Sequence, residues 1–225
     1  MMQVAPSEFL EQIDANKLSI TMIGMSNLGK THWSQMLSTI GFDHINCDDL
    51  IEFELIELMK AKGYTGGIED VARWMGMPYE DRYAVNQTKF LDIEKGVVSR
   101  LTSIDQPIIG NTIIDTSGSV VHTGPKLCEA LQNQTLMIYL AASQEHTERL
   151  FDKYIAEPKP VVFGNMFQPQ DGEENNVTLA RAYKNLLKER TELYEKYADV
   201  TLHSQDLANI SSGEDFLALV GKCLN

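Results

Sequence analysis

A glycine-rich segment at residues 24–31, GMSNLGKT, constrains the fold of this chain more than any other feature of its sequence. It fits the phosphate-binding pattern G-x-x-x-x-G-K-[ST] at every fixed position. The apolar run at residues 18–23 predicts a buried strand before it, and the apolar spacing of residues 30–40 predicts a helix after it. Because a helix N-terminus presents unpaired N–H groups and a positive dipole end, we expect this loop to bind nucleotide phosphates.

Each fixed residue of the loop has a physical task. Gly24 and Gly29 allow the backbone to curl tightly and to point its N–H groups inward. Lys30 supplies a mobile positive charge for the β- and γ-phosphates, and we expect its side chain to be exposed; Thr31 offers a hydroxyl to Mg²⁺. The residues expected to bind the nucleotide are Gly24, Met25, Ser26, Asn27, Leu28, Gly29, Lys30 and Thr31.

Short apolar runs alternate with helical patterns along all 225 residues. Strands are expected at residues 18–23, 42–47, 107–114, 135–140 and 199–203. Helices are expected at residues 7–14, 30–40, 48–62, 79–101, 125–131, 143–156, 176–197 and 213–224, with a short helical piece within 65–78. This alternation predicts a three-layer α/β fold, in which helices cover both faces of a parallel five-stranded sheet. The helix at 48–62 has a wide apolar face, which predicts deep burial.

We expect one domain over residues 1–225, with two specialised parts. Residues 157–176 contain three prolines and little periodicity, and a loop of this length inside a compact domain is typical of a lid, a binding loop or a disordered segment. The predicted helices within residues 48–102 form the part expected to bind a second substrate, the acceptor.

Composition excludes several classes of partner and location. With 32 acidic and 19 basic residues, the net charge is −13, which argues against a nucleic-acid or membrane surface as the main partner. Three distant cysteines form no disulfide framework, the N-terminus lacks the features of a signal peptide, and no apolar run is long enough for a membrane helix. We therefore expect a cytoplasmic protein; the sequence leaves the oligomeric state open, and we favour a monomer.

Carboxylates follow two of the predicted strands, and the carboxyl ends of parallel strands are where ligands bind in such sheets. Asp48 and Asp49 follow the second strand; the alternative to a functional role for them is N-capping of the next helix. Asp115 ends the third strand, as a Walker-B carboxylate that holds Mg²⁺ does, and its alternative role is that of a turn former.

These features together resemble the shikimate kinases, a family of small phosphate-loop kinases. The family pattern D-x-D-x-x-I-E corresponds to residues 46–52, NCDDLIE. The resemblance implies that Asp48 contacts the hydroxyl groups of the substrate near the transferred phosphate, while Asn46 replaces the family's Mg²⁺-associated aspartate. The family's T-G-G-G turn corresponds to residues 116–119, TSGS, so Gly118 is expected to touch the substrate.

The resemblance also assigns roles to basic residues. Lys159, in KPVV where the family has R-P-L-L, is implied to lie over the phosphates, and Arg149 near the adenine base. Arg190 matches an arginine that binds the substrate carboxylate. The second such arginine belongs to a pattern F-R-x-x-E, and residues 83–87, which match it best, place an alanine there. Either the register slips and the adjacent Arg82 serves, or one half of the carboxylate clamp is missing.

The sequence thus predicts an ATP- and Mg²⁺-dependent kinase that phosphorylates a hydroxyl of a shikimate-like metabolite. Lys30, Asp48 and Lys159 are the expected catalytic residues, and Thr31 and Asp115 the metal ligands. Two alternatives stay open: a kinase of another acceptor, such as gluconate or a nucleotide, and a non-catalytic nucleotide-binding protein with a degenerate acceptor site.

Overall fold

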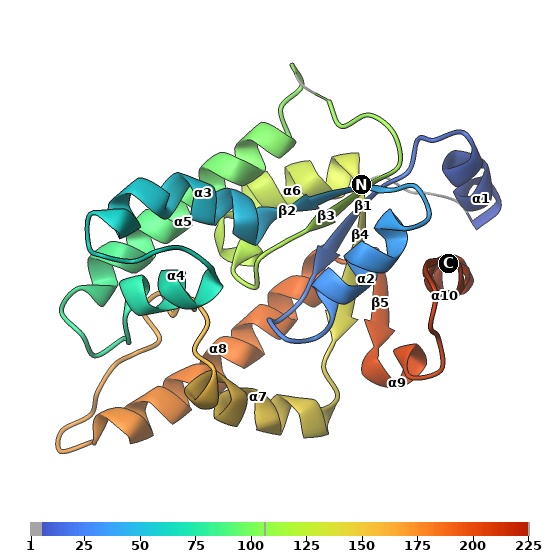
Figure 1. Cartoon of the computed structure of the whole chain (residues 1–225). Coiled ribbons are helices and arrows are strands. Elements are labelled where there is room, and N and C mark those ends of the chain that lie inside the picture. The colour runs from blue at the N-terminus through green and yellow to red at the C-terminus, as the bar shows by residue number, and fades with distance from the viewer. Residues whose placement is uncertain (1–5, 106, 225) are drawn as a thin grey trace.

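A parallel β-sheet forms the centre of the molecule, which a computed structural model describes for residues 6–105 and 107–224 (Figure 1). Its strands are β1 (Ser19–Ile23), β2 (Asp43–Asn46), β3 (Thr112–Asp115), β4 (Leu136–Ala141) and β5 (Val200–His203). They are ordered β2-β3-β1-β4-β5 and every pair is parallel. The predicted fold class is confirmed, and the carboxyl ends of all five strands lie at one edge.

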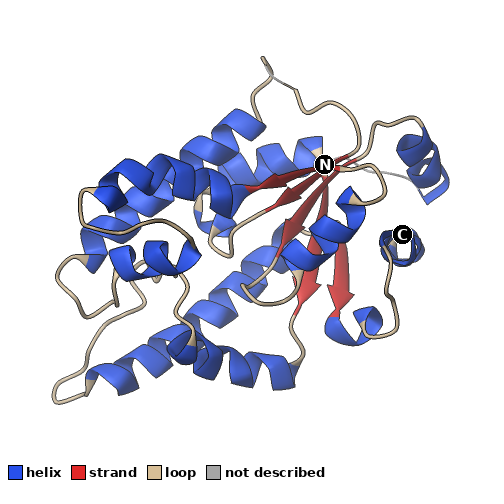
Figure 2. Cartoon of the chain, in the orientation of Figure 1, coloured by secondary structure: helices blue, strands red, loops and turns tan. Residues whose placement is uncertain are grey.

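Helices cover both faces of this sheet (Figure 2). They are α1 (Pro6–Asp14), α2 (Lys30–Ser38), α3 (Cys47–Lys60), α4 (Ile68–Met75), α5 (Tyr83–Leu101), α6 (Pro125–Gln134), α7 (Gln144–Ala156), α8 (Asn175–Tyr197), α9 (Ser204–Leu207) and α10 (Gly213–Cys223), with a 3₁₀ turn η1 (Val120–His122). The turns α9 and η1 are additions to the predicted elements. Helices α3, α4 and α5 pack on one another and form the part of the chain expected to bind the acceptor.

Side chains of the strands alternate between two separate cores. Along β4, Leu136, Ile138 and Leu140 face a core that includes residues of α1, α2 and α10. Met137 and Tyr139 face the opposite core, to which α3, α5, α6 and α8 contribute. Strands buried on both faces read as continuous apolar runs in the sequence, which is why the alternation of strand and helix was a reliable guide here.

Two predicted elements differ from the structure. The strand expected from residue 107 begins only at Thr112, because Gly110 has a left-handed φ of +89° and Asn111 bonds the backbone of Leu18 and Ile13 through its side chain. The prediction that α3 is deeply buried is wrong for much of its apolar surface. One face, repeating every fourth residue from Cys47, is buried, whereas Phe53 is 77% exposed.

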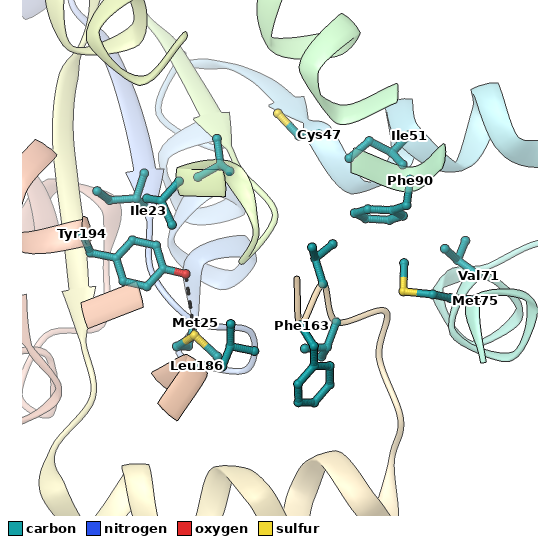
Figure 3. Close-up of a cluster of buried hydrophobic side chains, with 14 of the residues drawn as sticks. Ile23, Met25, Cys47, Ile51, Val71, Met75, Phe90, Phe163, Leu186 and Tyr194 are labelled. Carbon is teal, nitrogen blue, oxygen red and sulfur yellow. Dashed lines mark hydrogen bonds between the residues drawn. The ribbon is translucent and has the colours of Figure 1, made fainter. Parts of the chain in front are cut away.

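The predicted lid is divided by a buried anchor. Val161, Val162 and Phe163 are buried, and Figure 3 shows Phe163 in the same cluster as Phe90. The hydroxyl of Tyr83 donates to the carbonyl of Val161 (2.7 Å) and accepts from the N–H of Phe163 (2.9 Å). A segment held in this way cannot swing as one flap. Gln87 also bonds the backbone of Gly164, and Arg181 bonds Gln168 and Glu173.

We predict that Tyr83→Phe destabilises this anchor. Phenylalanine keeps the ring packed near Phe163 but leaves one buried carbonyl and one buried N–H without partners, which costs about 1–3 kcal/mol of unfolding free energy. Chemical denaturation measures the loss, and limited proteolysis should cut residues 157–176 faster. Tyr79→Phe, on an exposed tyrosine, is the control. Equal stability and equal cleavage of the two variants would contradict the anchor.

Candidate functional site

The loop between β1 and α2 adopts the strained backbone that its glycines were predicted to supply. Gly24 has φ +140°, and a Cβ there would lie 2.7 Å from the carbonyl oxygen of Leu140. Gly29, the residue before α2, has φ +92°. Asn27 takes a left-handed φ of +67°, which asparagine tolerates better than most residues. The loop therefore lies tightly against the end of β4.

Lys30 differs from its predicted environment. Its side chain is 7% exposed, so the expectation of an exposed lysine is wrong. The ammonium donates to the carbonyl oxygens of Gly24 (2.9 Å) and Met25 (3.1 Å), which folds the side chain back over its own loop. Burial lowers the pKa of Lys30, while the nearby carboxylates of Asp115 and Asp48 oppose that shift. Phosphate oxygens bound in the loop would take the place of the two carbonyl acceptors.

One cavity of about 210 Å³ collects most of the predicted site residues. It is lined by Ser26, Asn27, Gly29, Lys30, Thr31, His32, Asp48, Ile68, Asp115, Thr116, Ser117, Gly118, Lys159 and Pro160. These residues come from the phosphate loop, the first turn of α3, the start of α4, the loop after β3 and the predicted lid. The three expected catalytic residues and both expected metal ligands therefore share one space.

The carboxylate of Asp115 is buried at the end of β3 and has a free acceptor. Its Oδ2 atom has no hydrogen-bond partner, and the nearest basic group, Nε2 of His44, lies 3.8 Å away. A buried, unpaired carboxylate oxygen is costly unless a cation completes its environment. With Thr31 lining the same cavity, Asp115 fits the hard oxygen ligands that Mg²⁺ requires.

Asp48 is free of the capping role considered for it. The side chain of Asn46, at the N-cap of α3, accepts from the N–H groups of Asp48 (2.9 Å) and Asp49 (3.3 Å). Asp48 therefore directs its carboxylate to the cavity. Burial raises its pKa from 3.8 to about 6, with Asp115 adding to the shift and Lys30 opposing it. This carboxylate is thus a much stronger base than an exposed aspartate.

Sequence reasoning missed Glu94, a residue of α5 that supports the loop after β3. Glu94 is 1% exposed, and its carboxylate accepts from the hydroxyls of Ser117 and Ser119, the latter at 2.7 Å. Burial raises its pKa from 4.5 to about 7, against the two serine hydrogen bonds. One signal was available: Glu94 interrupts the apolar face of α5 next to Ile93 and Val97.

The loop after β3 has serines at two positions where the shikimate kinase pattern has glycines, and both side chains have partners. Ser117 and Ser119 are turned toward Glu94 and toward each other, with 3.0 Å between their hydroxyl oxygens. Gly118 between them lies close to other elements, since a Cβ there would be 3.3 Å from Oγ of Ser26 and 3.4 Å from Arg190. The Gly118 carbonyl accepts from the Tyr194 hydroxyl at 2.5 Å.

Three predicted arginines do not line this cavity. Arg82 lies on the surface, paired with Glu80 at 2.7 Å, and Arg149 is exposed on α7 and paired with Glu145 at 2.7 Å. Arg190 is 2% exposed, and its guanidinium donates to the carbonyl of Val162 at 2.9 Å.

Two residues of the phosphate loop also point elsewhere. Met25 is buried in the core, where Figure 3 shows it against the Tyr194 hydroxyl, 3.6 Å from its sulfur. Leu28 packs against both cores. Neither side chain lines the cavity, so any contact of these residues with phosphates would be made by their backbone.

The fold is shared with solved shikimate kinases. The enzyme from Acinetobacter baumannii, solved in complex with shikimate, is 19% identical with a TM-score of 0.54, over 91% of this chain and 92% of its own. The enzyme from Bacteroides thetaiotaomicron is 15% identical with a TM-score of 0.56, over 92% and 98%. No protein-family profile and no curated protein matches the chain. The chain therefore has the α/β fold of phosphate-loop kinases of the shikimate kinase type.

We predict that Glu94→Gln stabilises the protein more at pH 8 than at pH 5. The folded-state pKa is raised, so wild type loses stability as pH rises from 4.5 toward 7, by up to about 3 kcal/mol. Glutamine does not ionise and still accepts a serine hydrogen bond. Denaturation across this pH range measures the difference. Asp92→Asn, on the exposed side of α5, should show no such trend, and a pH-independent difference for Glu94→Gln would refute the raised pKa.

Proposed function

We propose that this protein is an ATP-dependent kinase that transfers a phosphoryl group to a hydroxyl of a small molecule. The observation that carries the proposal is the cavity in which Lys30, Asp48 and Lys159 meet beside the phosphate loop. Phosphoryl transfer depends on positioning and charge stabilisation more than on covalent chemistry, and a cavity with a phosphate cradle, two cations and a carboxylate base supplies both.

The phosphate loop would bind the ATP phosphates through its backbone N–H groups. Lys30 and Lys159 would neutralise charge that spreads over the transferred phosphoryl group, an effect that is large in a site shielded from water. Thr31 and Asp115 would hold Mg²⁺, which when bound neutralises phosphate charge and orients the phosphates for transfer.

Asp48 is proposed as the base that receives the proton of the acceptor. The hydroxyl oxygen forms a bond to the γ-phosphorus, the bond from phosphorus to the oxygen bridging to the β-phosphate breaks, and ADP leaves. The hydroxyl proton passes to Asp48, whose pKa of about 6 lies near physiological pH, where a general base works best. Ser117 and Gly118 would form the wall against which the acceptor lies.

A shikimate-like molecule, meaning a small polyol with or without the carboxylate that shikimate carries, is the acceptor on which we base the proposal. Its support is the shared fold with the A. baumannii enzyme solved with shikimate, and the match of Asp48 to the family's aspartate. A gluconate-like or nucleotide acceptor remains an alternative. Asn46, which replaces a family aspartate and caps α3 here, is the observation that favours a non-catalytic nucleotide-binding protein.

Lys30→Met tests the kinase assignment. Methionine keeps the length of the side chain and removes its charge, so ADP release should fall by at least about 100-fold, the scale on which single stabilising donors act. Lys60→Met, on an exposed residue of α3, should match wild type. A coupled assay with shikimate, gluconate and neutral polyols as acceptors reports ADP.

Two results would argue against the proposal. Equal ADP release by Lys30→Met and wild type means that the activity does not use the phosphate loop. ATP binding without ADP release, for every acceptor, selects the non-catalytic alternative.

A further inference from the structure

The cavity has no lysine or arginine left over to bind an acidic group of the acceptor. Among the side chains that the structure describes, the lysines and arginines lining it are Lys30 and Lys159 alone. The proposed function assigns both to the phosphates. Lys30 is also tied to the loop by two carbonyl contacts, so its ammonium points at the phosphate end of the cavity.

The long helix α5 does not supply the missing charge. Arg82, just before its first turn, pairs with Glu80, whose carboxylate also accepts from the N–H of Met77. Among the described residues of α5, no lysine or arginine lines the cavity.

Arg190 makes its hydrogen bonds within the protein, and only its Nε atom lacks a partner. Its guanidinium is sealed between Met25 of the phosphate loop, the carbonyl of Val162 and Gly118. At 2% exposure it presents no surface to the cavity, and its charge lies close enough to Glu94 to lower that residue's raised pKa. It therefore compensates a buried carboxylate and fixes the base of the predicted lid.

The charges that do face the acceptor are negative. Asp48 and Asp115 line the cavity, and Glu94 lies behind Ser117 and Ser119. A carboxylate brought there would meet like charges in a place where water screens them poorly. An ammonium group would find no carboxylate free, since Asp48 is assigned to the acceptor hydroxyl, Asp115 to Mg²⁺ and Glu94 to the two serines.

We infer that the acceptor is an uncharged polyhydroxy compound that carries no carboxylate; this inference rests on the proposed function and narrows its acceptor class. Hydroxyl groups match the remaining polar lining, which includes Ser26, Asn27 and His32.

Calorimetry on the full chain at pH 8, with Mg²⁺ and a non-hydrolysable ATP analogue, tests the inference. The probes are matched pairs: glucose with gluconate, and shikimate with the alcohol made by reducing its carboxyl group. The neutral member of at least one pair should bind at least about tenfold more tightly than its acid. Tighter or equal binding of the acid in every pair that binds, or no binding by any neutral member, overturns the inference.

Charge variants test the electrostatic cause. Asp48→Asn should reduce the preference for the neutral member by roughly fivefold or more, because it removes a like charge facing the acid. Asp49→Asn, on the next residue and outside the cavity, should leave the ratio of the two affinities unchanged. An unchanged ratio in Asp48→Asn also overturns the inference. Failure of the ATP analogue to bind is a different result, because it refutes the proposed function itself.

Discussion

Parallel pairing of β1 with β3 is the constraint on which the site depends. The register sets Met22 of β1 opposite Asp115 of β3, and Asn46 of β2 opposite the same Asp115. Three strand ends are thereby brought level, so that the phosphate loop, the start of α3 and the loop after β3 leave the sheet side by side. A slip of one residue would turn Asp115 to the opposite face of the sheet and remove it from the cavity. The backbone hydrogen bonds between these strands therefore determine where the side chains of the site lie.

The site concentrates charge where burial makes charge costly. Asp48, Glu94 and Asp115 lie near Lys30 and Arg190. The charges of Asp48, Asp115, Lys30 and Arg190 each shift the pKa of at least one other group in this set. Burial raises the pKa of Asp48 and of Glu94 and lowers that of Lys30, so every one of these shifts favours the neutral form. Such an arrangement stabilises the fold poorly, but it brings the pKa values of Asp48 and Glu94 close to neutral pH, where these groups can exchange protons.

The sequence predicted those parts of the molecule that depend on local pattern. Residues 24–31 carry a motif whose glycines adopt backbone conformations that other residues rarely adopt. The buried strands β1 and β4 are mostly apolar in sequence. Gly110 shortened β3 because one left-handed residue outweighs the apolar residues before it. The exposed Phe53 shows that a wide apolar face does not predict which residues are buried. Apolar residues on three sides of α3 cannot all pack against neighbouring elements.

What sequence could not supply were contacts between distant segments. Glu94 and Ser119 are 25 residues apart, and Arg190 and Val162 are 28 apart, so neither pairing follows from periodicity. The family pattern assigned Arg190 to a substrate, yet its place between Met25 and Val162 depends on how α8 packs against the phosphate loop. Lys30 was expected to be exposed because the motif describes its charge and not the carbonyls of Gly24 and Met25 that hold it.

The buried anchor at residues 161–163 limits how the predicted lid can move over the site. Tyr83 and Arg190 fix the backbone there, and the rings of Tyr154 and Tyr183 pack around Phe163. Lys159 lies only two residues before the anchor, at the cavity wall. Two residues span at most about 7 Å when extended, so Lys159 can adjust over the phosphates without travelling far from them. The fold thus keeps its second cation near the site, and a large lid motion is not required to deliver it.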